Sequence, residues 1–311
     1  MPAILTVAVS SRALFHIEDG HQIFETQGQA AFDEYMRSKE TTPLRPGSAF
    51  PLIRKLLALN PEEGPPLVDV VMLSRNSPDA GVRIMNSVDH YKLNIEGAIF
   101  SKGGDRFRYA TALGAQLFLS ANPGDVKLAL EHGIAAATIL PTERRADLAD
   151  DTIRIAFDGD AVLFSAEADE CYQAHGLAEF KRSESEKADI PLGAGPFKPV
   201  LESLHMLQRA LQQRFPEDAC PLKIAMLTAR GLQSHHRPIR TLRSWGITLD
   251  EVLFAAGRPK GPLLRAFGAD FFVDDTQKNI ASAVDCDIPS GHVPFGNGQG
   301  IVAPEPLAKA A

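Results

Sequence analysis

The sequence predicts an α/β protein with a Rossmann-like, mainly parallel sheet, and three observations lead to this prediction. Short apolar runs alternate with amphipathic segments along the chain, which is the pattern of βαβ units. Polar residues directly follow several of these runs, as at Asp158-Gly159-Asp160. The same order of parts also occurs in both halves of the chain, which predicts a duplicated α/β unit.

The composition restricts the class of function. The chain has 311 residues, of which 44% are hydrophobic and 23% charged, so it is long enough for two globular domains. The formal net charge of -7, without long blocks of Lys and Arg, argues against a nucleic-acid polymer or an anionic membrane as partner. A small-molecule substrate is therefore the better expectation, and a homo-oligomer stays open.

Cysteine usage and the apolar runs predict a cytoplasmic protein. Cys171, Cys220 and Cys286 are odd in number and lack a metal-type spacing, which fits a reducing compartment. Residues 1–14 lack the features of a signal peptide. No stretch approaches the ~20 apolar residues that span a bilayer.

The first half contains strand and helix candidates in alternation. Strands are predicted at 5–9, 68–73, 97–100 and 117–119, and helical spacing covers 31–36, 50–59, 80–88 and 126–132. A charged connector, residues 141–147, follows. We therefore expect a first α/β domain over residues 1–148 and a second over residues 149–311.

The second half repeats this alternation, with one added piece. Strands are predicted at 153–157, 224–227, 251–255 and 271–273, and a helix at 199–213. Residues 168–197 are polar and interrupted by Gly193 and Gly195, so we expect a small insertion near residues 166–198.

A fixed offset relates the two halves. Setting Ser74 against Thr228 gives an offset of 154 residues (228 − 74), and this offset also pairs Gly103 with Gly257, Arg106 with Lys260 and Ser120 with Asp274. An offset of 148 (158 − 10) pairs Ser10-Ser11-Arg12 with Asp158-Gly159-Asp160. Duplication is the simplest account, and chance similarity is the alternative. On this interpretation the first copy lacks the acids of the second.

Asp158 and Asp160 are placed for chemistry if the preceding run is a central strand. In open parallel sheets ligands bind beyond the carboxyl ends of the strands, which is where these two carboxylates would lie. The alternative is a turn in which Asp side chains bond to their own backbone. These two residues alone leave both interpretations open.

Three further strand ends carry polar groups. Thr228-Ala229-Arg230 could hold a phosphate oxygen, or Thr228 could cap the next helix. Lys260 lies beside a predicted helix start, which favours anions, although a solvated lysine is the alternative. Asp274 and Asp275 are adjacent acids, which cost stability unless a cation or hydrogen-bond donors compensate.

The four motifs together predict a phosphate site with a metal ion. Acids in this number suit a hard divalent cation, and a hydroxyl with an ammonium suits a phosphate. The order Asp-x-Asp, Thr, Lys, Asp-Asp, from residue 153 to residue 276, resembles the haloacid dehalogenase (HAD) superfamily. That resemblance implies an HAD-type sheet in the second half. The internal repeat then makes the first half a degenerate copy of it.

The resemblance also implies roles for individual residues. Asp158 would be the nucleophile, and Asp160 the general acid that protonates the leaving oxygen and then activates water. Thr228 and Lys260, with Ala229 and Arg230 in the same loop, would hold the phosphoryl group. Mg²⁺ would be bound by Asp158, the backbone carbonyl of Asp160 and Asp274, and Asp275 would assist either directly or through a ligand of the ion.

Longer segments are similar to the cytosolic 5′-nucleotidase type I family. They are Ser74-Arg75-Asn76-Ser77-Pro78, residues 157–165, Thr241-Leu242-Arg243-Ser244-Trp245-Gly246 and Gly291-His292-Val293-Pro294-Phe295-Gly296. The family implies Mg²⁺-dependent hydrolysis of nucleoside 5′-monophosphates, typically AMP. The alternatives are a sugar-phosphate phosphatase or phosphotransferase, and a nucleotide-binding regulatory protein.

The sequence predicts contacts to the nucleoside part of the substrate less clearly than contacts to the phosphate. The interval between Thr228 and Lys260 is too short for a cap domain, so a lid is expected from the insertion or from the first half. Phe164 is a candidate for stacking on the base. Ser74, Arg75 and Asn76 are candidate contacts if the first half reaches the site, and for each a structural role is the alternative.

Overall fold

The computed structural model describes residues 2–140 and 150–294, and its main element is one ten-stranded sheet. The strands of this sheet are β1 (Leu5–Val9), β4 (Val68–Ser74), β5 (Gly97–Phe100), β6 (Leu117–Ser120), β7 (Ala135–Ile139), β8 (Ile153–Phe157), β9 (Leu222–Thr228), β10 (Glu251–Phe254), β11 (Phe271–Asp274) and β12 (Ser290–His292). A small separate sheet pairs β2 (Phe15–His16) with β3 (Arg45–Pro46).

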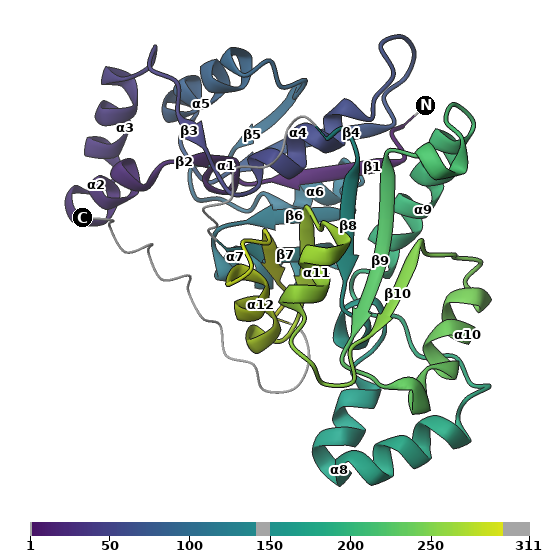
Figure 1. Ribbon diagram of the computed structural model, residues 1–311. Coiled ribbons are helices and arrows are strands. Elements are labelled where there is room, and N and C mark those ends of the chain that lie inside the picture. The colour runs from purple at the N-terminus through teal and green to yellow at the C-terminus, as the bar shows by residue number, and fades with distance from the viewer. Residues whose placement is uncertain (1, 141–149, 295–311) are drawn as a thin grey trace.

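Helices pack on both faces of the large sheet (Figure 1). They are α1 (Ser11–Leu14), α2 (Glu18–Gln27), α3 (Gln29–Ser38), α4 (Phe50–Ala58), α5 (Pro78–His90), α6 (Phe107–Ala112), α7 (Pro123–Glu131), α8 (Glu167–Glu186), α9 (Lys198–Gln212), α10 (His236–Ser244), α11 (Gly261–Phe267) and α12 (Gln277–Val284). Shorter turns are η1 (Gly159–Leu163), η2 (Glu217–Ala219) and η3 (Leu232–Ser234). Local signals explain several helix starts: the side chains of Ser77 and Asn122 cap α5 and α7, and each cap is followed by a proline.

The sheet consists of two halves with the same strand order. The order is β10-β9-β8-β11-β12-β7-β6-β1-β4-β5. Counted outward from the β12-β7 junction, β12, β11, β8, β9 and β10 correspond in turn to β7, β6, β1, β4 and β5. All neighbours within each half are parallel. The halves meet where β12 pairs with β7 in antiparallel orientation. The carboxyl ends of the two sets of strands therefore lie at opposite edges of the sheet.

Backbone conformation follows the same offset as the sequence. Five residues between 92 and 133 have a left-handed φ, and a residue 154 positions later has one too. The pairs are Lys92 and Gly246, Lys102 and Ala256, Gly103 and Gly257, Gly114 and Gly268, and Gly133 and Asp287. Because left-handed residues are uncommon outside glycine, this coincidence supports a repeated unit more strongly than the sparse sequence identities do.

One apolar cluster spans both halves. Alternate residues of β1 and β8, such as Val7 and Ile155, point into this cluster, where α4 and α9 also pack. The intervening residues Ala8 and Ala156 point to the other face, into two separate clusters covered by α6 and α7 in the first half and by α11 and α12 in the second. The halves therefore share one core layer.

Most of the expected elements are confirmed. Every predicted strand and helix is present to within a few residues. The α/β class with a mainly parallel sheet is confirmed as well. No range was predicted for α1, α2, α6, α8, α10, α11, α12, β2, β3, β7 or β12. Of these, the long helix α8 occupies most of the expected insertion.

The predicted connector, the predicted domain boundary and part of one motif cannot be compared with the structure. The connector 141–147 and the boundary after residue 148 lie outside the described residues, as do Phe295 and Gly296 of the last quoted motif. Among the described helices, none combines the length and apolar character needed to cross a bilayer.

Candidate active site

The predicted motifs meet at one edge of the sheet. Asp158 follows β8, Thr228 ends β9 and Asp274 ends β11, and these strands are adjacent in the order β9-β8-β11. Lys260 is the N-cap residue of α11. All four side chains are buried. These four side chains therefore converge beyond the carboxyl ends of the strands, as expected for residues that follow neighbouring parallel strands.

Lys260 lies between two carboxylates. Its Nζ is 2.7 Å from Asp158 Oδ1 and 2.6 Å from Asp274 Oδ2. Asp274 Oδ1 accepts hydrogen bonds from Thr276 N at 2.7 Å and Asn279 Nδ2 at 3.2 Å. With Lys260 1% exposed, the alternative of a solvated surface lysine does not apply.

The pKa values show an excess of buried negative charge. Burial raises the pKa of Asp158 well above its usual range, Lys260 opposes this, and Asp274 and Asp275 add to it. Burial and the Asp274 carboxylate raise the pKa of Asp275 to about 8. Burial alone would lower the pKa of Lys260, but Asp158 and Asp274 outweigh it and raise that pKa. One ammonium therefore does not compensate all of the acids.

The acid cluster fits a hard divalent cation. One carboxylate oxygen each from Asp158, Asp274 and Asp275 lie within 4.8 Å of one another. Asp158 Oδ1 is buried, and no described donor makes a well-aligned hydrogen bond to it. Carboxylate oxygens are the donors that Mg²⁺ prefers. The Asp160 side chain does not belong to this cluster, so any contribution from Asp160 is limited to the predicted backbone carbonyl.

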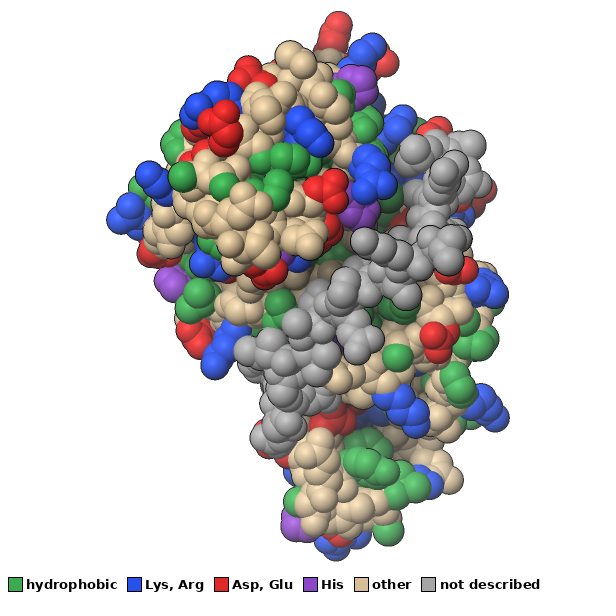
Figure 2. All heavy atoms as spheres, turned by 90° about the vertical axis from the view of Figure 1, so that its left-hand side faces the viewer, with side chains coloured by type: hydrophobic (Ala, Val, Ile, Leu, Met, Phe, Trp, Pro, Cys, Tyr) green, Lys and Arg blue, Asp and Glu red, His purple; other side chains and the backbone are tan. Residues whose placement is uncertain are grey.

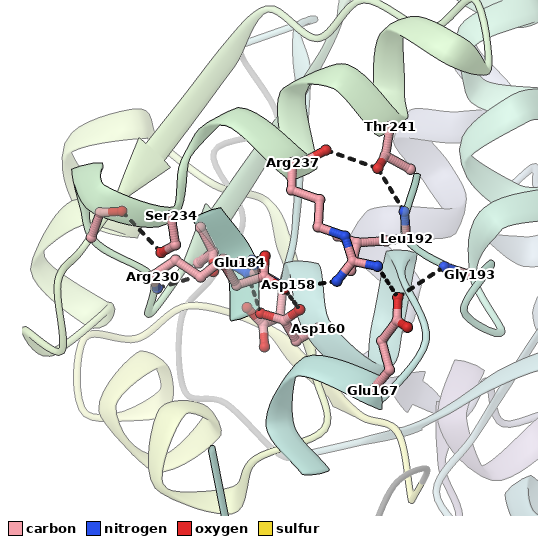
Figure 3. A network of polar contacts seen from close by, with 12 residues as sticks. Asp158, Asp160, Glu167, Glu184, Leu192, Gly193, Arg230, Ser234, Arg237 and Thr241 are labelled. Carbon is pink, nitrogen blue, oxygen red and sulfur yellow. Dashed lines mark hydrogen bonds and ion pairs between the residues drawn. The ribbon is translucent and has the colours of Figure 1, made fainter. Parts of the chain in front are cut away.

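Asp160 is held by an arginine in a two-point contact. The turn η1 after β8 is closed by a hydrogen bond from Phe164 N to Gly159 O at 2.8 Å, with Ala161 in a left-handed conformation. Arg230 Nε donates to Asp160 Oδ2 at 2.8 Å and Arg230 Nη2 to Oδ1 at 2.7 Å (Figure 3). Such bidentate pairs fix a carboxylate in one orientation.

The Arg230 contact continues into α8. Glu184 of α8 is buried and accepts hydrogen bonds from both Arg230 and Arg237 (Figure 3). Arg237 also reaches Glu167 at 2.9 Å and the carbonyl of Ile190 at 2.8 Å. In Figure 1, α8 extends beyond the ends of β8, β9 and β10. Ion pairs with Arg230 and Arg237 therefore fix the inserted segment to the residues that follow β9.

Comparison with known proteins identifies the family. A family model described as 5'-nucleotidase matches residues 1–300. The chain belongs to the 5′-nucleotidase family. It is 37% identical over 287 residues to cytosolic 5'-nucleotidase 1B from Homo sapiens, covering 90% of this chain and 47% of that protein. The chain thus spans about half the length of this curated relative.

Similarity to solved structures is low. A structure of the Pnkp1/Rnl/Hen1 complex gives a TM-score of 0.34 at 13% identity, covering 96% of this chain and 98% of that chain. Histidinol dehydrogenase from Elizabethkingia anophelis gives 0.24 at 8% identity, covering 94% of this chain and 80% of that chain.

Some predicted nucleoside contacts do not lie at this site. Phe164 is fully buried, with its ring centroid 5.5 Å from that of Trp245, so it has no surface to offer a base. Ser74 ends β4, and Arg75 and Asn76 follow it, so all three lie at the opposite edge of the sheet. Within the described residues, the structure thus places these three residues away from the acids.

The structure adds residues that sequence reasoning missed. Glu184 and Arg237 carried no signal, because charged residues in a helical stretch usually face solvent. His292 of β12 lies with Nε2 2.9 Å from the carbonyl oxygen of Asp275, and so positions that acid. His292 belongs to one of the segments that resemble the family, which was the available signal.

Proposed function

We propose that this chain is a Mg²⁺-dependent 5′-nucleotidase that hydrolyses nucleoside 5′-monophosphates, AMP among them, through an aspartyl-phosphate on Asp158. Membership of the 5′-nucleotidase family supports the reaction class. The observation that carries the mechanism is the buried contact of Lys260 with both Asp158 and Asp274, beside Asp275. That arrangement supplies a nucleophile, a fixed cation and metal ligands at one strand edge.

The first half-reaction uses Asp158 as nucleophile. One Asp158 oxygen attacks phosphorus, a new P–O bond to the carboxylate forms, and the bond to the nucleoside 5′-oxygen breaks. Lys260 binds the phosphoryl oxygens and reduces their repulsion with the carboxylate. Thr228 adds a hydroxyl at the neighbouring strand end. Mg²⁺, held by Asp158, Asp274, Asp275 and the Asp160 carbonyl, supplies positive charge to the phosphoryl oxygens when bound.

Asp160 handles the proton in both half-reactions. As the acid it gives a proton to the leaving 5′-oxygen, and as the carboxylate it takes one from the water that hydrolyses the aspartyl-phosphate. The second step releases phosphate and restores Asp158. In the described structure Asp160 is the ion-paired carboxylate bound by Arg230. This is the form that accepts a proton, so the first step requires Asp160 to take up a proton and loosen this contact.

A substrate panel tests the proposed function. Phosphate release is measured with 5′- and 3′-monophosphates of each nucleoside and with glucose 6-phosphate, in Mg²⁺ and then in excess EDTA. We expect turnover of the 5′-nucleotides, reversible loss in EDTA and recovery on adding Mg²⁺. Faster release from glucose 6-phosphate than from any nucleotide would replace the proposal with a sugar-phosphate phosphatase.

The nucleophile has its own test. Asp158→Asn removes the attacking carboxylate but changes little volume, so kcat should fall by on the order of 10³-fold or more while the fold persists. Asp151→Asn, at an exposed position before β8, is the matched control and should retain activity. Near-normal turnover by Asp158→Asn would remove Asp158 from this role.

A further inference from the structure

A cavity of about 460 Å³ lies in the first half of the chain, at the carboxyl ends of β1, β4 and β6. It occupies the position that corresponds to the acid cluster of the second half, but at the opposite edge of the sheet. Its volume is within the range of small-molecule sites. The reaction proposed above does not use it.

The loop after β4 keeps the shape of the phosphate loop after β9. Asn76 N donates to Ser74 Oγ at 3.2 Å, as Arg230 N donates to Thr228 Oγ1 at 3.2 Å. The bond from Gly103 N to the Arg75 carbonyl matches the bond from Gly257 N to the Ala229 carbonyl. A hydroxyl and a tight turn are therefore retained where the second half is proposed to hold a phosphoryl group.

The counterparts of Asp158 and Asp274, by contrast, are not acids in the first half. Ser10 stands in place of Asp158, and Ser120 in place of Asp274, and both serines line the cavity and are buried. Ser11 Oγ lies 3.1 Å from Ser74 Oγ. Hydroxyls accept and donate hydrogen bonds without repelling a dianion, but they supply neither the nucleophile nor the metal ligands. The cavity is thus suited to hold a phosphate and unsuited to hydrolyse it.

Cations surround the polar end of the cavity. Arg75 is 56% exposed, Lys102 is exposed, and both line the cavity. Its one lining acid in this region, among the described residues, is Asp125, which is paired with buried Arg106 at 2.5 Å and with Arg75 at 3.5 Å. The lining charge that is left over is therefore positive.

The other end of the cavity is aromatic. Phe24 and Phe32 line it, with ring centroids 6.3 Å apart in an edge-to-face arrangement, and Phe24 is 43% exposed. His21 stacks beside Phe24 at 6.4 Å. In the view of Figure 2, taken from the side where α2 and α3 lie in Figure 1, Lys and Arg side chains lie near hydrophobic ones. Aromatic faces of this kind bind planar heterocycles.

We propose that this cavity binds a nucleoside phosphate without hydrolysing it. The phosphate lies against Ser10, Ser11 and the Ser74 loop, with Arg75 and Lys102 beside it, and the base lies against Phe24 and Phe32. The site does not depend on the acids of the second half. Its test therefore succeeds or fails separately from the test of the proposed hydrolysis.

Photolabelling of the full chain with 8-azido-AMP tests the site. The reaction is run in EDTA and mapped by mass spectrometry after trypsin digestion. Cleavage after Arg12 and Arg37 gives peptide 13–37, which contains His21, Phe24 and Phe32. We expect saturable labelling of this peptide that AMP competes and adenosine does not. Labelling that is absent from peptide 13–37, or competed equally by adenosine, overturns the proposal.

A charge-reversed pair of variants separates binding from folding. Arg75→Glu with Lys102→Glu changes only exposed side chains and should reduce labelling of peptide 13–37 by at least about 10-fold. Arg214→Glu with Arg243→Glu, also exposed, makes the same charge change away from the cavity and should leave labelling within about two-fold. Phosphate release from saturating AMP should be unchanged in both. Equal labelling in the two double variants overturns the proposal.

Discussion

At the scale of single residues, the site is organised by uncompensated negative charge. Lys260 is buried between Asp158 and Asp274, yet the pKa of Asp275 is still raised to about 8 by burial and by Asp274. The residue types and their order predicted this site, because carboxylates, a hydroxyl and a lysine at successive strand ends are the side chains that bind a divalent cation and a phosphate. The sequence did not predict that Arg230 contacts Asp160, since that depends on which side chain reaches inward.

Asp169 at the start of α8 gives a pH prediction. Burial, and then the Asp160 carboxylate, raise its pKa from 3.8 to about 6. Between these values the unfolded chain has released a proton that the folded chain still holds, so stability falls as pH rises, and the full penalty applies above pH 6. In metal-free protein at pH 7.5, Asp169→Asn should therefore raise the free energy of unfolding by about 1–2 kcal/mol, after allowing for partial exposure.

Urea unfolding at pH 4 and pH 7.5 checks this effect. The gain from Asp169→Asn should shrink to less than about 0.6 kcal/mol at pH 4, where the folded form is protonated and the unfolded form is close to its pKa of 3.8. Glu170→Gln, an exposed neighbour on α8, should change stability by less than about 0.5 kcal/mol at either pH. A gain that is the same at both pH values would show that charge is not its cause.

At the scale of elements, α8 is the part that the sequence left least determined. Its mean composition is polar, and Gly176 interrupts it with a left-handed φ, so no apolar stripe indicates a long helix. The stabilising contacts are instead charged pairs from Arg230 and Arg237 to Glu184. Such long-range polar contacts leave no periodicity in the sequence, whereas β8 and β9 were predicted correctly from short apolar runs.

Glu184 should be essential for holding α8. Glu184→Ala leaves Arg230 and Arg237 buried with one carboxylate fewer, which should lower the free energy of unfolding by about 3 kcal/mol. Glu186→Ala on the same helix is the control, because its contact with Arg182 is exposed and 3.8 Å long, and should cost less than about 0.5 kcal/mol. Similar small losses in both variants, measured by urea unfolding, would contradict this role.

At the scale of the whole molecule, the two halves are joined by one continuous sheet and one apolar cluster. The sequence predicted the repeat and its missing acids, and the matching strand order and left-handed residues agree with it. It could not predict how the halves join, because β7 and β12 are short and β12 contains Gly291 between two polar residues. That join decides which residues share a site, and so it separates Ser74 from Asp158.

The shared core should make the halves unfold together. Lys55 of α4 in the first half donates to Asp270 Oδ1 at 2.8 Å and to the Thr152 carbonyl at 2.9 Å in the second. Lys55→Met should leave the Asp270 carboxylate without this cation and lower the free energy of unfolding by about 2–4 kcal/mol, in a single transition. Arg182→Met, which removes exposed pairs, should cost less than about 1 kcal/mol.

Thermal unfolding followed by two optical probes checks cooperativity. Trp245 fluorescence reports the second half, and far-UV circular dichroism reports both. The two midpoints should coincide in wild type and in Lys55→Met. Separate transitions would show two independent domains rather than one unit.

The pairing of β7 with β12 has a consequence for association. Ile139 faces Gly291 and Thr138 faces His292 in antiparallel register, and a Cβ at residue 291 would lie 2.8 Å from that of Ala137. Two equivalent units that meet edge to edge in this way have the relation of partners in a two-fold dimer. Each unit covers the strand that would otherwise accept a foreign chain. In the described sheet the remaining edges are β10 and β5, of four residues each, and edges this short resist unwanted strand addition.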